Sequence, residues 1–499
     1  MIYQKIYSEK MTDEKVKWNS NLSFLLAMIG SAVGLGNIWR FPYVAYTNGG
    51  GAFLIPYILS IIFLGIPLLF VEYGAGYKFK SGISKIAHKI NSKYEYIGWF
   101  IQASPFLILT YYVVVVAWDL IYVPLSFFKG WGPKPEEFFT NTILQNSADP
   151  SGLFSIAIYV LIALIIVWAI VWFISHRNLN DGVGKANRIL TPLLFICMII
   201  IVAFAVTLPG ASLGLTTLFT PDWNSVLNPN IWVAAFGQIL FSLSIGMTIT
   251  LAYASYLPDE TNIPRSALTV AIANSSFEVF TAAGVFSILG FMSTTNNIPI
   301  GELVSQGTGL AFVAFPEIFN VMGTLGYVIG PLFFLCLLFA GITSNISIIE
   351  PLALSVQDKF NISRSRAVSI ISIVAFVISL LFATTYGSTL LGVFDTFVNQ
   401  FGLLLNVTLQ TILLAVIYGL DKLLPGINKN ATFLKLGKKW ILLVTYIIPV
   451  ISFILWIQAV FTNVIFVDTT TLIIEFILLM IMIILPYILT KSIPRSGDY

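Results

Sequence analysis

The sequence is poor in charge and nearly devoid of cysteine and histidine. Only 10% of its 499 residues are Asp, Glu, Lys or Arg, against about 25% in an average soluble domain. In contrast, 57% of the residues are hydrophobic and the mean hydropathy is +0.89. A soluble fold cannot cover so much apolar surface with so few charges, so the composition predicts a protein that crosses a membrane many times.

Scarce cysteine and histidine exclude several kinds of chemistry. Cys197 and Cys336 both lie inside long apolar runs, which excludes a disulfide framework and a thiolate metal site. His88 and His176 lie in polar stretches beside basic residues. The spans lack paired His ligands, a Ser-His-Asp set and a Cys with a nearby base, so we expect no membrane enzyme.

Twelve apolar stretches are long enough to cross a bilayer, which takes roughly 20 residues in a helix. They cover residues 22–47, 52–77, 98–128, 152–174, 188–208, 231–257, 264–291, 328–357, 367–385, 389–420, 440–462 and 469–490. We therefore expect an all-α polytopic membrane protein with twelve transmembrane helices. The glycine-containing stretch 292–327 predicts an ordered outer loop with a short helix or two.

Basic residues are distributed unevenly between the loops. All but three of the 26 Lys and Arg residues lie before the first span, after the last, or in or beside the connections that follow even-numbered spans. The exceptions are Lys129 and Lys134 in an odd-numbered connection and Arg40 within a span. Because cytoplasmic loops carry an excess of Lys and Arg, we expect a multi-pass cell-membrane protein with both termini in the cytoplasm.

Two spans contain small and polar residues where a continuous helix would be expected. The first span holds Gly30, Gly34 and Gly36, followed by polar residues, and the sixth holds the run SLSIGMT from Ser242. Tight glycine-mediated helix packing is the alternative, but it does not explain the polar residues. We expect both helices to be unwound here, with backbone N–H and C=O groups left to bind ligands.

Spans one and six hold corresponding positions if spans 1–5 and 6–10 form two halves of the chain. Five spans is an odd number, so the halves must have opposite topology, and matching interruptions in inverted halves indicate a transporter site. The expected parts are a cytoplasmic segment at 1–21, a first inverted repeat at 22–208, an extracellular loop at 209–230, a second inverted repeat at 231–420, and two extra helices with a cytoplasmic tail at 421–499.

Three motifs fall on these spans. GLGNIWRFPY begins at Gly34 and is followed by NGGGAF from Asn48; GQILFSLS begins at Gly237, and AGITS at Ala340. With these motifs the chain resembles the neurotransmitter:sodium symporter family, and it is most similar to the prokaryotic amino-acid transporters within it. The resemblance runs from about Lys15 to the last span and implies a 5+5 inverted-repeat fold with unwound helices 1 and 6.

The resemblance implies two sodium sites built from oxygen atoms, which small hard cations prefer. The first site takes the Ala32 carbonyl, the side chains of Asn37, Ser242 and Asn274, and the substrate carboxylate. The second takes the carbonyls of Gly30, Val33 and Ala340 and the hydroxyls of Thr343 and Ser344. The alternative for Thr343 and Ser344 is a hydrogen bond within their own helix.

The resemblance also implies a substrate site. Tyr112 and the N–H groups around Gly34 and Gly36 would bind a carboxylate, and carbonyls near Ala32 and Phe241 would bind an amine. The implied contacts are Ala32, Gly34, Gly36, Ile108, Tyr112, Phe241, Ser242, Ser244, Met247 and Ile348. The side-chain pocket is apolar apart from one hydroxyl, and it contains no Asp for a second amine.

Several charged residues take roles from the same resemblance. The implied outer gate is Arg40, Asp395 and Phe241, and the implied inner latch is Lys15, Trp18 and Asp358. Glu278 stands where chloride-dependent relatives carry serine, so its carboxylate would replace chloride. Glu72 would support the unwound part of the first span through hydrogen bonds.

These features predict a sodium-coupled, chloride-independent symporter that imports hydrophobic or aromatic L-amino acids by alternating access. The alternatives are a transport-inactive amino-acid sensor or receptor on the same fold, or a symporter for another small zwitterion. A channel fits least, since the unwound residues form no repeated filter. Expected partners are the amino acid, sodium ions and the lipid bilayer, with a homodimer left open and no nucleic acid, because the basic loops fit topology alone.

Overall fold

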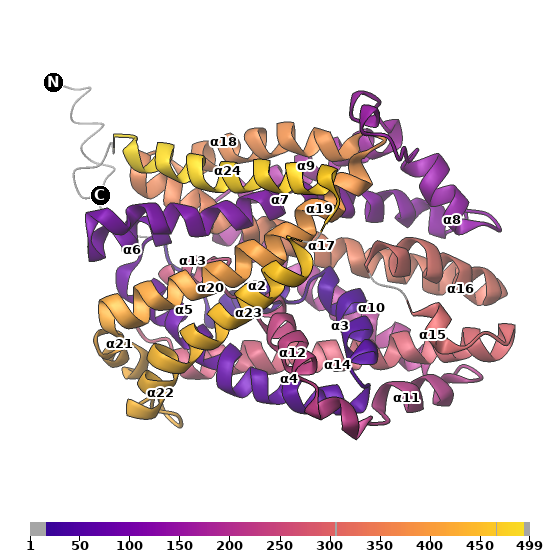
Figure 1. Cartoon of the computed structure of the whole chain (residues 1–499), viewed down its shortest axis with the longest axis horizontal. Helices are drawn as coiled ribbons and strands as arrows, with labels where there is room; N and C mark the ends of the chain where they lie inside the picture. The colour runs from indigo at the N-terminus through magenta and orange to yellow at the C-terminus, as the bar shows by residue number, and fades with distance from the viewer. Residues whose placement is uncertain (1–15, 305–306, 466, 494–499) are drawn as a thin grey trace.

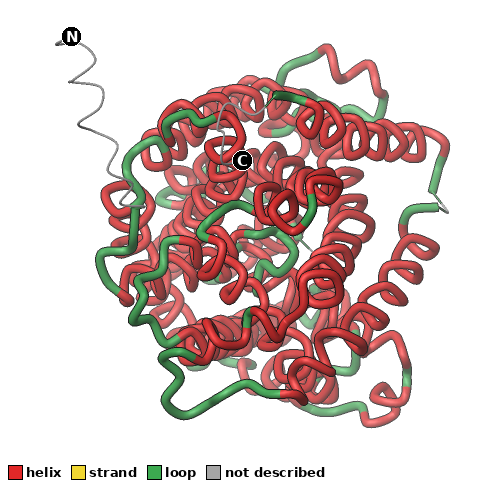
Figure 2. Tube along the Cα trace, turned by 90° about the vertical axis from the view of Figure 1, so that its left-hand side faces the viewer, coloured by secondary structure: helices red, strands yellow, loops and turns green. Residues whose placement is uncertain are grey.

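All regular structure in the described chain is helical. The computed structural model describes residues 16–304, 307–465 and 467–493 (Figure 1). Within these ranges the elements are helices joined by loops and turns, with two isolated β-bridges but no strand (Figure 2). The all-α architecture predicted from hydropathy is confirmed.

The helices of the first half of the chain begin at Asn21. They are α2 (Asn21–Ala32), α3 (Leu35–Thr47), α4 (Leu54–Ser60), α5 (Ile66–Phe79), α6 (Ile83–Ile90), α7 (Glu95–Ser126), α8 (Pro135–Glu137), α9 (Ile158–Ser175), α10 (Lys185–Ala205) and α11 (Ala211–Phe219). Those of the second half are α12 (Pro229–Ser242), α13 (Ile249–Ser255), α14 (Ile263–Asn296), α15 (Ile300–Leu303), α16 (Phe315–Val321), α17 (Gly326–Phe360), α18 (Arg364–Ser379), α19 (Gly387–Phe397), α20 (Leu404–Thr411), α21 (Leu424–Asn428), α22 (Lys438–Leu442), α23 (Ile448–Asn463) and α24 (Thr469–Lys491).

Short π-helical turns join several of these helices into longer rods. They are η2 (Ile61–Gly65), η4 (Phe138–Ile143), η6 (Asn180–Gly184), η8 (Leu310–Ala314), η11 (Val398–Leu403), η12 (Ile412–Gly419) and η14 (Leu443–Ile447). The 3₁₀ turns are η1 (Gly51–Phe53), η3 (Ser92–Tyr94), η5 (Pro150–Phe154), η7 (Trp223–Leu227), η9 (Gly323–Leu325), η10 (Leu380–Ala383) and η13 (Leu420–Lys422).

The described chain has ten or eleven helical spans, depending on whether a bent pair of helices is counted as one span. Ten continuous helices are long and apolar enough to cross a membrane, and α2 with α3 makes an eleventh that is bent by 50°. Helices α12 and α13 together occupy the predicted sixth span and are separated by six residues. α12 packs on α4 and α13 packs on α5, the two halves of one continuous helix, so the pair follows that helix across the bundle.

The broken helices lie inside the bundle (Figure 1). α2 packs against α10, α14 and α17, and α3 packs against α14. In the most apolar windows of α7 and α14, 72% of residues are buried, against 22% in α24, which presents its apolar side chains outward. The interior of the bundle thus surrounds the two breaks.

The bundle has two distinct ends (Figure 1). The short helices α6, α21 and α22 lie at the left-hand end, which we call the N-terminal side because Trp18 packs there against the end of α13. The helices α8, α11, α15 and α16 lie at the other end, which we call the opposite side. The expected short helices of residues 292–327 are α15 and α16, with the π-turn η8 between them.

Candidate functional site

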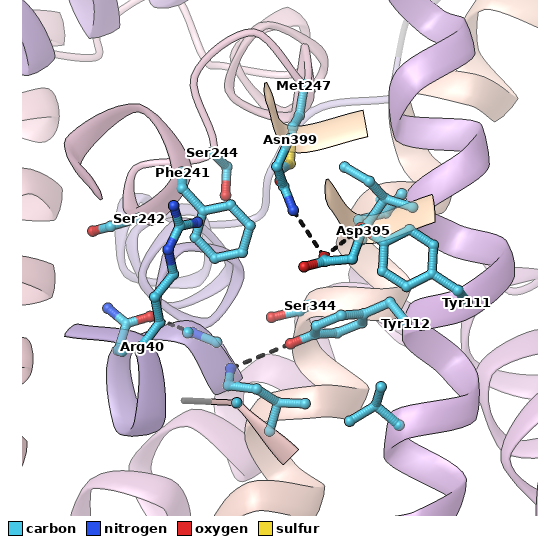
Figure 3. A pocket seen from close by; sticks show the side chains of 18 of the residues that line it. Arg40, Tyr111, Tyr112, Phe241, Ser242, Ser244, Met247, Ser344, Asp395 and Asn399 are labelled. Carbon is cyan, nitrogen blue, oxygen red and sulfur yellow. Dashed lines mark hydrogen bonds between the residues drawn. The ribbon is translucent and has the colours of Figure 1, made fainter. Parts of the chain in front are cut away.

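A cavity of about 400 Å³ lies between the two helix breaks (Figure 3). It is lined by residues of α2, α3, α7, α12, α13, α17 and α19, by the break of the sixth span, and by Gly307 and Thr308. All ten residues expected to contact a substrate lie on its wall. The structure therefore brings together side chains that are more than 300 positions apart in the sequence.

The first break places a helix N-terminus in the cavity. α2 ends at Ala32, Val33 and Gly34 are extended, and α3 starts at Leu35. The N–H of Leu35 donates to the Tyr112 hydroxyl at 3.2 Å, and the N–H of Gly34 donates to Asn37 Oδ1 at 2.9 Å. This end carries the partial positive charge of a helix N-terminus, which favours an anion.

Glycine is required at this break because other groups approach its backbone. A Cβ on Gly36 would lie 2.5 Å from the Phe241 ring. A Cβ on Gly34 would lie 3.0 Å from Ser344 Oγ and 3.2 Å from the Tyr112 hydroxyl. The extended backbone thus runs directly between the cavity side chains of α7 and α17.

The second break is held open by side chains from other helices. Ser244, Gly246 and Thr248 all have positive φ, at 55°, 80° and 60°, which ends α12. Glu72 accepts from the Gly246 N–H at 3.0 Å, and Asn406 Nδ2 donates to the Gly246 carbonyl at 3.2 Å. We expected Glu72 to support the first span; that prediction was wrong, because its carboxylate lies against the freed backbone of the sixth.

The residues of the predicted first sodium site form one hydrogen-bonded chain. Asn37 Nδ2 donates to Asn274 Oδ1 at 2.8 Å, and Asn274 Nδ2 donates to Ser242 Oγ at 2.5 Å. All three side chains are buried, and Asn37, Ser242 and Ala32 line the cavity. Neutral oxygens of this kind suit a small hard cation.

The residues of the predicted second sodium site meet where α17 passes the first break. The Ser344 hydroxyl is buried and has no hydrogen-bond partner among the described residues. The Thr343 hydroxyl donates to the carbonyls of Phe339 and Ala340, each at 3.0 Å, so the alternative of a hydrogen bond within its own helix is observed for this residue. Its oxygen lone pairs can still accept a cation. An orphaned buried hydroxyl beside an unwound backbone fits a sodium ligand set.

Gly30 lies at the tight approach of α2 to α10. A Cβ there would lie 2.3 Å from Asn187 Oδ1 and 2.4 Å from Thr191 Oγ1. Gly30 and its neighbour Val33 are buried. The Gly30 carbonyl therefore lies in the last turn of α2, and the Val33 carbonyl lies at the break itself.

Glu278 lies next to the first sodium set on α14. It is fully buried, with Oε1 accepting from Gln238 Nε2 at 2.8 Å and Oε2 accepting from the Tyr57 hydroxyl. The hydrogen-bond donors Gln238 and Tyr57 thus converge on one negative charge. Sequence reasoning singled out Glu278 but missed these two partners.

The two residues of the predicted outer gate lie on opposite walls of the cavity (Figure 3). The Arg40 guanidinium lies over the Phe241 ring, 4.6 Å from its centroid. Asp395 Oδ1 instead accepts from the Tyr111 hydroxyl and from Asn399 Nδ2, both at 2.8 Å. Both residues are described and no ion pair joins them, so the predicted gate contact is not made in this structure.

The N-terminal side is closed by contrast. Trp18 is 3% exposed; its Nε1 donates to the Tyr253 carbonyl at 2.9 Å and its N–H donates to the Tyr256 carbonyl at 3.0 Å. Asp358 accepts from the Gly82 N–H at 2.7 Å. Lys15, the third expected latch residue, lies outside the described residues.

Part of the cavity wall was not predicted. The additional residues are Ser31, Leu35, Trp39, Tyr111, Val115, Ile249, Gly307, Thr308, Leu391, Gly392, Thr396, Asn399 and Gln400. Asn399 is one helical turn beyond Asp395, and Val115 is about one turn beyond Tyr112. For Asn399 and Val115, helical spacing from the predicted residues is the sequence signal that would have identified them.

This arrangement defines a class of protein: a multi-pass membrane transporter with a central site between two discontinuous helices. The model of the Sodium:neurotransmitter symporter family matches residues 15–134 and 130–491, so the chain belongs to that family. It is 40% identical to an uncharacterized sodium-dependent transporter of Methanocaldococcus jannaschii, over 88% of this chain and 89% of the relative.

Animal transporters are more distant relatives. The chain is 29% identical to the sodium- and chloride-dependent GABA transporter 2 of Mus musculus, over 84% of this chain and 76% of the relative. It is also 29% identical to the sodium- and chloride-dependent creatine transporter 1 of Bos taurus, over 82% of this chain and 71% of the relative.

Proposed function

We propose that this protein is a sodium-coupled symporter that imports hydrophobic or aromatic L-amino acids by alternating access and does not require chloride. Membership of the sodium symporter family supports sodium coupling. The observation that supports the proposed substrate class is the lining of the cavity, which combines polar backbone groups with apolar side chains.

The polar end suits a zwitterion. The N-terminus of α3 and the Tyr112 hydroxyl offer donors to a carboxylate. The C-terminal carbonyls of α2 lie on the same wall and suit an amine. A carboxylate placed beside Asn37 would itself become a ligand of the first sodium ion, which couples substrate binding to sodium.

The apolar end selects the side chain. Ile108, Met247 and Ile348 line it and are each at most 5% exposed, and the Phe241 ring borders it. Met adapts its shape, so aromatic and branched aliphatic side chains both fit. A charged side chain would have no partner there, and burying an unpaired charge is strongly unfavourable.

The substrate prediction is tested by uptake of each of the twenty amino acids into proteoliposomes, with and without an inward sodium gradient. We expect leucine- and tryptophan-like substrates to be taken up only with the gradient, and charged amino acids to be rejected. Preference for glutamate or γ-aminobutyrate over leucine or tryptophan would contradict the proposed pocket. Binding without counterflow would instead identify a sensor.

A second candidate is a symporter for another small zwitterion. The names of the animal relatives favour it, since γ-aminobutyrate and creatine are both zwitterions. The same uptake panel separates the candidates when it includes both compounds. The apolar lining supports the amino-acid proposal over this one.

The orientation follows from charge. The N-terminal side carries Lys85 and Lys89 on α6 and Lys438 and Lys439 on α22. Such clusters mark the cytoplasmic face of a membrane protein. We therefore place the closed side in the cytoplasm, with the cavity facing the exterior of the cell membrane.

The gate prediction concerns Asp395→Asn. In alternating access the cavity must close over the substrate, and pairing of Arg40 with Asp395 is the available contact. Hydrogen bonds between charged groups contribute about 1.5–3 kcal/mol, so transport should fall roughly tenfold or more while equilibrium substrate binding changes little. Asn399→Ala, which removes a neutral partner of Asp395, is the matched control. An equal loss of binding and transport would rule out a gate role.

A further inference from the structure

A carboxyl group with no partner lies deep in α7. Asp119 is 0% exposed, and neither of its carboxylate oxygens has a hydrogen-bond partner in the described part of the chain. It lies seven residues beyond Tyr112, which is about 10 Å along the helix. Unlike Glu278, Glu72 and Asp395, it takes no part in the site described above.

The walls around Asp119 are apolar and aromatic. Val116, one turn earlier, packs against Gly341 of α17, where an added Cβ would lie 2.4 Å from its methyl carbon. Tyr122, one turn later, packs against Phe334 of the same helix, with ring centroids 5.0 Å apart. Asp119 therefore lies where α7 packs against α17, between the Val116–Gly341 contact and the Tyr122–Phe334 contact.

The titratable groups near Asp119 are few and carry no positive charge. Tyr112 on its own helix and the Cys336 thiol on α17 lie within electrostatic range. Cys336 donates to the Leu194 carbonyl of α10 at 3.6 Å, and Cys197 follows on that helix.

Charged groups on the other elements that pack against α7 are engaged elsewhere or distant. Asp395 of α19 bonds Tyr111, and Lys359 and His88 both bond Glu95, which is 24 residues, or about 36 Å, from Asp119. Glu475 lies on α24. That helix contacts α7 near the N-terminal side of the bundle, where the Tyr96 hydroxyl donates to the Ile483 carbonyl. No described cation pairs with Asp119.

A carboxylate in such surroundings is very costly unless a positive charge lies near it, so the group binds a proton when no cation is close. Sodium requires several oxygen ligands, and the side chains that flank Asp119 do not supply them; the described residues also hold no cluster of three acidic, His or Cys side chains suited to a metal. We propose that Asp119 is a proton-binding site, and that its proton is exchanged with solvent in a way coupled to sodium binding.

The coupling follows from the position of the two helices. Along α17, Ala340, Thr343 and Ser344 follow the residues that pack beside Asp119. These three residues belong to the proposed second sodium site, on which this step rests. When the O–H bond of the acid breaks and the proton passes to solvent, the remaining negative charge attracts the sodium ion. By reciprocity, sodium binding favours release of the proton.

The test is sodium binding to the purified full-length protein at pH 6, 7.5 and 9. We expect sodium affinity of the wild type to rise with pH by on the order of fivefold or more, a typical coupling between two ligand sites. Asp119→Asn should bind sodium with an affinity that changes far less with pH. Glu475→Gln, which alters a buried carboxyl outside the site, should retain the dependence.

The outcomes separate this inference from the proposed function. Equal pH dependence in wild type and Asp119→Asn would overturn the proton site while leaving sodium coupling intact. Loss of sodium binding at every pH in the wild type would instead overturn the proposed function. If Asp119→Asn does not fold, Asp119→Leu provides a second variant.

A further measurement leaves Asp119 unchanged. Infrared difference spectra of the Glu475→Gln variant should show a protonated carboxyl that is lost on sodium addition. Absence of that band would overturn the proposal.

Discussion

Sodium-dependent substrate binding should be lost when Thr343 and Ser344 are both replaced by alanine. The double variant removes two of the five proposed oxygen ligands of the second sodium ion. Each buried ligand contributes about 1–3 kcal/mol, so sodium affinity should fall by roughly 30-fold to 10⁴-fold. Sodium titration of substrate binding in detergent measures the change directly.

The structure indicates that this variant will fold. The Ser344 hydroxyl has no partner in the described chain, and the Thr343 hydroxyl bonds only carbonyls of its own helix. Alanine is also the best helix former. Thr343→Ser, which retains a hydroxyl at the same place, is the matched control and should keep its sodium dependence. Unchanged sodium dependence in the double variant would discard the second sodium site.

The second large effect is expected for Glu278→Ser, which should make transport depend on chloride. The substitution removes the acceptor of Gln238 Nε2 and of the Tyr57 hydroxyl, both of which point into a buried space. An unsatisfied buried donor costs about 1–3 kcal/mol, and a chloride ion accepts from both donors while restoring the lost negative charge. Uptake in gluconate should therefore fall by roughly tenfold or more and recover with chloride.

Glu278→Gln distinguishes charge from volume. It fills the same space, so it leaves no room for chloride, and its transport should not respond to that ion. The wild type should transport equally well with either anion. A wild type that stops when chloride is withdrawn would overturn the role proposed for Glu278.

The apolar spans and the two breaks were predictable because they depend on local composition. Apolar runs set the span lengths, and the glycines around Gly34 mark the first break. The positions of Ser244 and Thr248 in left-handed conformation were not predictable, since neither is glycine. Their strain is offset by tertiary contacts such as that of Glu72 with Gly246, and such contacts leave no local signal.

The part of the candidate site that belongs to the short sequence motifs was predictable. Asn37, Ser242 and Thr343 belong to short motifs, and the structure brings them to the two breaks. The cavity wall that contains Thr396 and Asn399 depends on how α19 and η11 are placed against α7. That placement results from packing between distant segments, which a single sequence does not encode locally.

The Trp18 contact and the first break are the two ends of one rigid rod. α2 has twelve residues and is about 18 Å long, with Trp18 just before its start and the extended Val33 and Gly34 just after its end. A tilt of about 10° around the break moves the far end by about 3 Å, enough to separate Trp18 from the Tyr253 carbonyl. A ligand that changes the angle of α2 at the break is therefore expected to move Trp18 at the other end of the helix.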